Sequence, residues 1–144
     1  MKTAELYDLD FAQWAKENAE LLRSGRFSEA DIEHVAEEIE DLAKRKWWAL
    51  YSRFARLIEH LLNWQFQPER RGTSWKRTIA VQRERIKLLL EENPSLRPGL
   101  DSVISKAYRE AAGNIAIIIG RSRKDFPETC PYTTDQLLDE DFLP

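Results

Sequence analysis

The sequence predicts an all-α fold: a helical bundle of about four main helices, the second very long, with an extended C-terminal tail packed along the bundle. Only five glycines and six prolines interrupt the 144 residues, and 33% of the residues are charged. Apolar residues recur at spacings of three and four over long stretches. Few chain breakers and many charges are typical of long helices rather than of a sheet-rich or disordered chain.

The length predicts a single all-helical domain, residues 1–144, large enough to bury a sizeable core. The one cysteine, Cys130, excludes an internal disulfide, and the first residues lack the order of a secretory signal. We therefore expect a reducing, cytoplasmic location. No apolar run approaches the ~20 residues that cross a bilayer, so no membrane association is expected.

The first helix is predicted within "DFAQWAKENAELLRSG", with Asp10 as its N-cap and Gly25 as its left-handed stop. One face of this helix is expected to pack on the rest of the protein. It carries Phe11, Trp14, Asn18, Leu21 and Leu22.

The second helix is predicted to open at a capping box formed by Ser28 and Asp31 and to run to Gln67, because Pro68 cannot continue it. A break near "KRKWW" is the alternative. The predicted apolar arc is centred near Ile39 and Leu57. It contains Ile32, Val35, Ala36, Ile39, Leu42, Ala43, Leu50, Phe54, Leu57, Ile58, Leu61 and Leu62.

The third helix is predicted to follow Gly72, capped by Thr73 or Ser74, and to end at "NPSLRPG". Its stripe reads Trp75, Ile79, Gln82, Ile86, Leu89 and Leu90. A fourth helix is expected to carry Leu100 to Ile115 and to stop at Gly120.

The tail, residues 121–144, has room for one short helix after Thr133 or Thr134. We expect it to run along the bundle, because its apolar side chains would otherwise be exposed to solvent. They are Phe126, Tyr132, Leu137, Leu138, Phe142 and Leu143.

Nearly the whole chain resembles a bacterial family, the domain of unknown function 29, which is common in cyanobacteria. The matching stretches are "YDLDFAQWAKENAELLRSGRFSEADIEHVAEEIEDLAK", "HLLNWQFQPERRGTSWKRTIAVQR", "NPSLRP" and "FPETCPYTTDQLLDEDFLP". The resemblance implies a compact, all-helical protein that stands alone as a domain. It implies no activity and no catalytic residue.

Charge is distributed unevenly around a net charge of −3. Residues 1–44 hold 12 acids and 5 bases, residues 45–124 hold 17 bases and 7 acids, and residues 125–144 hold 6 acids and no base. This order has two explanations: the acidic ends neutralise the basic middle, which we favour, or the middle is open to an anionic partner.

A basic patch with interleaved aromatic residues surrounds Pro68 and continues along the third helix. Its bases are Arg70, Arg71, Lys76, Arg77, Arg83 and Arg85. Bases beside Trp64, Phe66 and Trp75 are what single-stranded nucleic acid requires. Because Trp64 and Trp75 fall on the apolar faces, we expect both rings to be packed inside, which makes nucleic-acid binding the less favoured interpretation.

A polar layer is predicted at the border of the apolar arc, where Lys46, Arg53, His60 and Gln82 interrupt the packing positions. A buried base needs a partner, so we expect a carboxylate, from Glu17, Glu20 or Glu110, beside Arg53 or Lys46. A structural network is the favoured interpretation, and an acid–base or ligand site centred on His60 is the alternative.

No catalytic residue, metal site or cofactor is predicted. Asp31, His34 and Glu38 share one region of the second helix, but no other helix supplies ligands that converge on them. Cys130 has no nearby histidine in sequence, and no glycine-rich loop cradles phosphate.

Two features predict a protein partner. Adjacent Trp47 and Trp48 point about 100° apart, so at least one should emerge on the surface, and "IAIII" at 115–119 leaves its helix without a polar face. We therefore expect a small, non-enzymatic interaction protein, with a homodimer as the favoured assembly.

Overall fold

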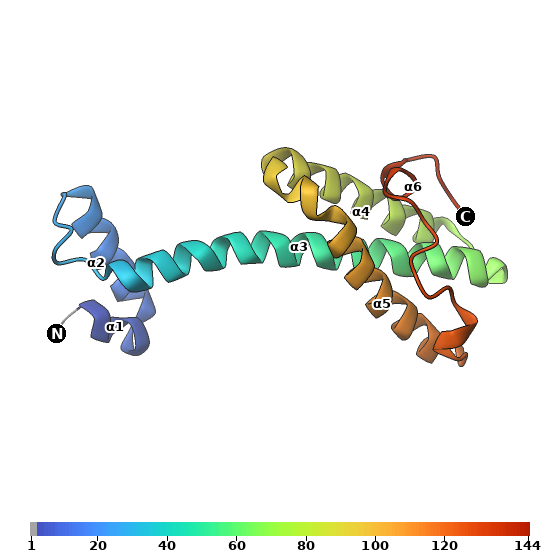
Figure 1. The fold of residues 1–144 in the computed structure, drawn as a ribbon, viewed down its shortest axis with the longest axis horizontal. Helices are drawn as coiled ribbons and strands as arrows, with labels where there is room; N and C mark the ends of the chain where they lie inside the picture. The colour runs from blue at the N-terminus through green and yellow to red at the C-terminus, as the bar shows by residue number, and fades with distance from the viewer. Residues whose placement is uncertain (1–2) are drawn as a thin grey trace. The chain divides into compact units, whose positions relative to one another are not determined.

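The computed structural model describes residues 3–144, and within that range it contains helices and no strand (Figure 1). The α-helices are α1 Thr3–Leu9, α2 Phe11–Arg23, α3 Ile32–Phe66, α4 Thr73–Glu92, α5 Leu100–Ile119 and α6 Thr134–Leu138. Short 3-10 helices cover Pro68–Arg70, Pro94–Gly99 and Arg123–Asp125. The predicted all-α fold with one very long helix is confirmed.

Contacts within the chain group into two compact units, and the boundary in the sequence falls between Arg45 and Lys46. The first holds α1, α2 and the start of α3, and the second holds the rest of α3 and everything that follows. The predicted single-domain organisation stays a prediction, because α3 contributes residues to both units.

In the first unit, α2 has the ends that the sequence predicts. The Asp10 side chain accepts from the backbone N–H of Gln13 at 3.1 Å, and Gly25 has a φ of +73°, the left-handed conformation that glycine adopts without strain. Helix α1 was not predicted. It has only seven residues and none of them is buried, so it leaves little periodic signal.

Helix α3 begins at Ile32 and not at the predicted Ser28. The residue before it, Asp31, accepts from the backbone N–H groups of His34 through its side chain (3.4 Å) and of Val35 through its carbonyl (3.0 Å). An aspartate in this position satisfies the first-turn donors, which makes Asp31 the cap rather than the last residue of a capping box. The helix continues without a break to Phe66, two residues before Pro68.

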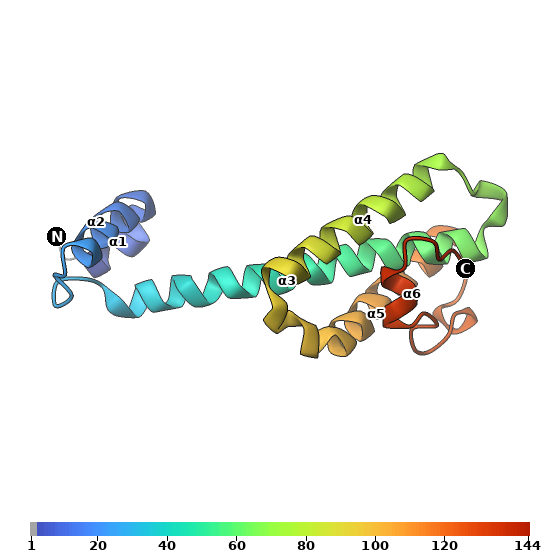
Figure 2. The ribbon, with the colours of Figure 1, turned by 90° about the horizontal axis from the view of Figure 1, so that it is seen from above.

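One hydrophobic core joins α3, α4, α5 and the tail in the second unit, where α4 and α5 lie against the later part of α3 (Figure 2). Its members from the three helices keep the predicted spacing. They are Leu50, Phe54, Leu57, Ile58, Leu61, Leu62, Ile79, Ile86, Leu90, Leu100, Val103, Ile104, Ala107, Tyr108, Ala111, Ala112, Ile115 and Ala116.

The tail packs on this core as predicted, through buried Phe126, Tyr132 and Leu137. Helix α6 opens at Thr133, whose side chain accepts from the backbone N–H of Gln136 at 3.1 Å, while the Gln136 side chain accepts from the backbone N–H of Thr133 at 2.9 Å. These bonds fix the short helix at the position that the sequence predicts.

Of two predicted helix boundaries, the structure confirms the end of α5 and contradicts the start of α4. Gly120 has a φ of +71° and ends α5 as predicted. The predicted capping of α4 by Thr73 or Ser74 is wrong, because Gly72 precedes the helix without a side-chain bond and Thr73 is already helical.

Candidate interaction surface

The first part of α3 presents apolar side chains to solvent. Ile32 is 49% exposed, Ile39 61% and Leu42 57%, and Val35 between them is half-buried. The sequence placed all four in the apolar arc of a buried core, and for Ile32, Ile39 and Leu42 this expectation is wrong. Their periodicity is that of a packed helix, yet Ile32, Ile39 and Leu42 each keep about half or more of their surface exposed. We call Ile32, Val35, Ile39 and Leu42 the α3 apolar stripe.

A polar cluster holds α1 and α2 to the start of α3. Asp31 is its centre: its Oδ2 atom accepts from Trp14 Nε1 at 2.9 Å and lies 2.6 Å from His34 Nδ1. Buried Asn18 accepts from the Asp31 backbone N–H at 2.7 Å and donates to the Trp14 carbonyl at 2.9 Å. The Tyr7 ring stacks on the His34 ring at 3.8 Å.

The electrostatics of this cluster follow from its bonds. The hydrogen bond to Asp31 raises the pKa of His34, and Glu37 and Asp8 act in the same direction. Burial alone would raise the pKa of Asp31, but the bonds from Trp14 and His34 lower it overall. Tyr7 donates to Glu38 Oε1 at 2.5 Å, which raises the pKa of Tyr7 to about 12. Tyr7 therefore acts as a hydrogen-bond donor and not as an acid.

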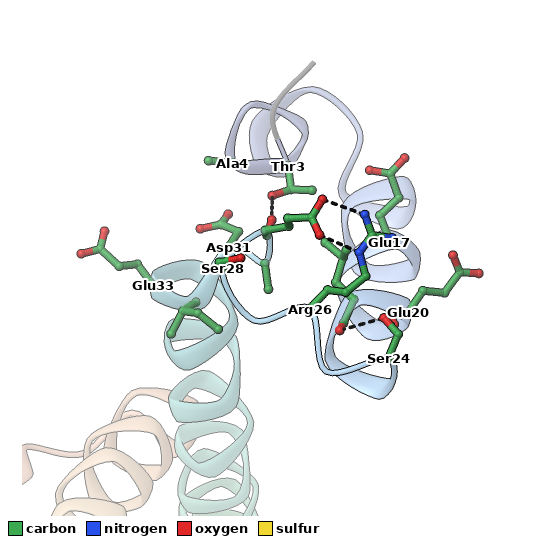
Figure 3. Close-up of a pocket in the computed structure, with 13 residues that line it drawn as sticks. Thr3, Ala4, Glu17, Glu20, Ser24, Arg26, Ser28, Asp31 and Glu33 are labelled. Carbon is green, nitrogen blue, oxygen red and sulfur yellow. Dashed lines mark hydrogen bonds and ion pairs between the residues drawn. The ribbon is translucent and has the colours of Figure 1, made fainter.

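An open hollow of about 960 Å³ lies beside the cluster and was not predicted (Figure 3). Carboxylates dominate its lining, from Glu17, Glu20, Glu29, Asp31 and Glu33. The one lining base, Arg26, is paired with Glu29 at 2.6 and 2.7 Å. Figure 3 marks these two bonds of Arg26 with dashed lines. Across residues 3–144, no three His, Cys, Asp or Glu side chains are placed to hold a metal ion.

Five of the six residues of the predicted basic patch are exposed: Arg70, Arg71, Lys76, Arg77 and Arg85. Arg83 is the exception, with 2% exposure, and its place in the patch is a wrong prediction. Its guanidinium donates to the backbone carbonyls of Leu137 (2.8 Å) and Gln136 (3.2 Å). Arg83 therefore fastens the tail and presents no charge to a partner.

The aromatic rings beside these bases are not open platforms. Trp64 is 9% exposed, with the Arg71 guanidinium 5.3 Å and the Lys76 ammonium 5.7 Å from its ring centre, and Trp75 is half-buried. Arg71 Nε also donates to the Trp64 carbonyl at 2.7 Å. The two bases cover the indole face on which a nucleobase would stack.

The predicted polar layer is reduced to one pair. Arg53 Nη1 donates to Gln82 Oε1 at 3.4 Å, so its partner is an amide and not the expected carboxylate. His60 is half-buried, and its Nδ1 lies 3.0 Å from the carbonyl of Arg56, one turn earlier in its own helix. Lys46 is exposed. The structure thus brings Arg53 and Gln82 together, with no described hydrogen bond joining His60 or Lys46 to them.

A second, smaller group of apolar side chains is exposed in the second unit. Trp48 is 57% exposed and Trp47 half-buried, which confirms that one of the adjacent tryptophans emerges. The Trp47 ring stacks on Tyr51, and Lys106 lies over Trp47 at 5.3 Å. These residues line an open hollow of about 650 Å³ together with Arg109 and Glu110.

The one cysteine is not activated for nucleophilic chemistry. Cys130 is a half-buried free thiol, and burial raises its pKa, so it is a poor nucleophile.

Among the described residues, no helix combines the length and apolar character that crossing a membrane requires.

A family model described as "Domain of unknown function DUF29" matches residues 6–143, nearly the full length. The chain belongs to the DUF29 family. No curated protein and no solved structure matched it significantly. The family description names no activity, so the chemistry of this DUF29 protein has to be derived from its own surfaces. Of these, the α3 apolar stripe carries three exposed large apolar side chains at the spacing of a packed helix face.

Proposed function

We propose that this DUF29 protein is a small, cytoplasmic, non-enzymatic interaction module that self-associates through the α3 apolar stripe. The observation that supports it is the exposure of Ile32, Ile39 and Leu42 at the spacing of a packed helix face. Scattered exposed apolar residues are ordinary, whereas three at helical spacing on one helix mark a contact surface.

Burying the α3 apolar stripe in an interface would release a large free energy for so short a segment. Burying an exposed isoleucine or leucine side chain is worth roughly 1.5–3 kcal/mol when it is complete. A symmetric dimer would bury the stripe twice, once from each copy. Even partial burial of Ile32, Ile39 and Leu42 from both chains therefore offsets much of the entropy lost on association.

The histidines do not favour an enzyme. The Nδ1 atom of His60 faces a backbone carbonyl of its own helix, and that of His34 faces Asp31. The Asp31 oxygen beside His34 also accepts the indole N–H of Trp14, and the Asp31 side chain is 7% exposed. This pair is built into the contact between helices, which supports a structural role.

The test compares two exposed leucines. Leu42 is 57% exposed on α3 and Leu88 is 52% exposed on α4, so Leu42→Lys and Leu88→Lys change charge and area alike. Sedimentation velocity of the full chain at about 100 µM should show a dimer for the parent and for Leu88→Lys. Leu42→Lys should shift the protein to monomer. A parent that sediments only as a monomer, or a Leu42→Lys dimer as tight as the parent, would reject the proposal.

A second candidate function is polyanion binding by Arg70, Arg71, Lys76, Arg77 and Arg85. It is favoured by one observation: these side chains are exposed, and none of them takes part in an ion pair among the described residues. Binding of a short single-stranded oligonucleotide should then weaken steeply with salt and be lost in Arg70→Glu/Arg77→Glu. Because Trp64 is covered, the interaction should show little base preference. Absence of binding at physiological ionic strength would remove this candidate.

A further inference from the structure

We propose that the second unit binds the surface of an anionic membrane through the outward face of α5. Apolar side chains at the end of this helix insert among the lipid headgroups, and the lysine and arginine side chains around them contact the lipid phosphates. The inference goes beyond self-association, because it concerns a different surface and leaves the α3 apolar stripe free.

Two adjacent isoleucines in the last turn of α5 are largely exposed: Ile117 is 81% exposed and Ile118 is 64% exposed. Neighbouring side chains on a helix point about 100° apart, so these two do not share the narrow stripe that a partner helix covers. Gly120 ends the helix directly after them. Ile117 and Ile118 therefore form an apolar helix end, which we call the α5 tip. Such a group can enter the boundary between headgroups and acyl chains.

Two bases lie on the same face of α5 as Ile117. Lys106, Arg109, Gly113 and Ile117 are separated by three, four and four residues, the spacing of one helix face. Both bases are exposed, and neither takes part in an ion pair among the described residues. Their charges are therefore accessible to lipid phosphates on the side of the helix that carries the tip.

Two more bases follow the α5 tip. Arg121 and Lys124 are exposed, and no ion pair within residues 3–144 uses them. The segment that carries them is held in place, because Arg123 donates to the carbonyl of Pro127 at 3.0 Å and Phe126 is buried. The tip thus has positive charge before it and after it in the chain.

The first acid after the tip, Asp125, is used inside its own loop. Its side chain accepts from the backbone N–H of Ser122 at 3.3 Å and completes the cap of a short 3-10 helix. This bond gives Asp125 a structural role beside the exposed bases.

Exposed Trp48 extends the face onto α3. The hollow of about 650 Å³ described above is lined by Trp47, Trp48, Tyr51, Lys106 and Arg109, with one acid among its lining residues. Tryptophan and tyrosine concentrate at membrane–water boundaries, because the ring is apolar and its N–H or O–H group is polar. Aromatic and basic side chains side by side are therefore suited to the same anionic surface as the α5 tip.

The mixture of apolar and basic side chains favours a membrane over a nucleic acid. A nucleic acid would pair with the bases but leave the α5 tip in water, whereas anionic lipid supplies phosphates for the bases and an apolar layer for the tip. The second unit holds 16 bases and 13 acids, so its own charge is positive although the whole chain is acidic. The sequence predicts no membrane association because no segment can span a bilayer, but binding at the surface requires no span.

Vesicle co-sedimentation of the full chain tests the proposal. Vesicles of phosphatidylcholine alone are compared with vesicles of phosphatidylcholine and phosphatidylglycerol at about 3:1. The protein should bind the anionic vesicles about tenfold more tightly or better, and this binding should weaken as salt is added. Equal binding to both kinds of vesicle, or binding to neither, would overturn the proposal.

A pair of double variants tests the α5 tip. Ile117→Ser/Ile118→Ser should weaken binding to the anionic vesicles about tenfold or more. Val81→Ser/Leu88→Ser removes two exposed apolar side chains from α4 and should alter binding by less than about twofold. Circular dichroism verifies that both proteins keep the parent helix content. An equal loss of vesicle binding in the two would contradict the role of the tip.

A second pair tests the bases at constant net charge. Arg109→Glu/Arg121→Glu should weaken vesicle binding about tenfold, whereas Arg70→Glu/Arg77→Glu should change it by less than about threefold. The reverse order would assign lipid binding to the bases near Pro68 and reject the α5 face. If Arg109→Glu/Arg121→Glu loses oligonucleotide binding while its vesicle binding is unchanged, this face serves nucleic acid and the proposal is rejected.

Discussion

The Nε atom of Arg83 on α4 donates to the backbone carbonyl of Leu137 on α6 at 2.8 Å, and its Nη2 donates to the carbonyl of Gln136 at 3.2 Å. Both carbonyls belong to the last turn of a five-residue helix, where the helix itself supplies few N–H donors. A buried arginine thus serves as the C-terminal cap of a helix 53 and 54 residues away in sequence.

Replacing this arginine should loosen the tail. Arg83→Met keeps most of the side-chain volume but removes the donors to two carbonyls, so we expect the free energy of unfolding to fall by about 2–3 kcal/mol. Urea denaturation followed by circular dichroism measures the change. Arg85→Met is the matched control, since Arg85 is exposed on the same helix; its effect should stay within about 0.5 kcal/mol. Equal effects of the two substitutions would contradict the capping role.

The first unit should lose stability as pH rises through the pKa of His34. The bond to Asp31 raises that pKa above the ordinary value of 6.5, so the folded state holds its proton more tightly than the unfolded state. The resulting stabilisation is fully present below about pH 6.5 and disappears as pH rises through the folded-state pKa. Amide exchange of α2, compared at about pH 6 and pH 9 after correction for intrinsic rates, should reveal weaker protection at the higher pH.

His34→Gln should abolish this pH dependence, because it removes the titrating group. His60→Gln should preserve it, since the His60 ring contacts a backbone carbonyl and not a carboxylate. An NMR titration that places the His34 pKa at or below 6.5 would contradict the prediction directly.

Asn18 should be essential to the first unit although it lies on an apolar face. Its side chain accepts from the Asp31 backbone and donates to the Trp14 carbonyl, and it is 2% exposed. In Asn18→Leu the new side chain has a similar volume, but the half-buried backbone N–H of Asp31 loses its acceptor. The free energy of opening that amide exchange reports for α2 should therefore fall by about 2–3 kcal/mol. Gln13→Leu, at a less buried position of the same helix, should change it little. Unaltered protection in Asn18→Leu would show that the cluster is held by Trp14 and His34 alone.

Two glycines, one inside α5 and one at its end, should respond in opposite directions to alanine. Gly113 lies inside the helix, and an alanine methyl group there would meet no atom within 4 Å beyond its chain neighbours and the backbone of its own helix. Gly113→Ala should therefore raise stability by about 0.5–1 kcal/mol. Gly120 has a φ of +71°, and Gly120→Ala should lower stability by about 1 kcal/mol despite the open space around it. Thermal unfolding of the two variants measures both shifts, and shifts of the same sign would contradict the argument.

Local patterns predicted most helices well. The spacing from Leu50 to Leu62, the stop at Pro68 and the left-handed Gly25 and Gly120 depend on the chemistry of a few neighbouring residues, and the structure agrees with them. Helix α1 was missed because seven residues without a buried side chain carry too little periodicity. Its anchors, Tyr7 with Glu38 and His34, are contacts between segments that are far apart in the sequence.

At the candidate site, too, local sequence patterns predicted some features, and others depend on contacts between distant segments. Periodicity marked Ile32, Ile39 and Leu42 as residues that need a partner, but it cannot tell whether that partner belongs to the same chain. Charge marked Arg83 as a surface base, because an arginine is seldom buried without a carboxylate. Only the course of the tail shows that two carbonyls of α6 lie within reach of it.

By itself, then, the sequence determined the helical class, the end of α3 before Pro68, the glycine stops of α2 and α5 and the excess of apolar residues along α3. These features depend on spacing and on local backbone preference. Which apolar residues are covered and which bases are buried were decided by the tertiary structure. These properties depend on segments brought together across tens of residues, and no local pattern records that proximity.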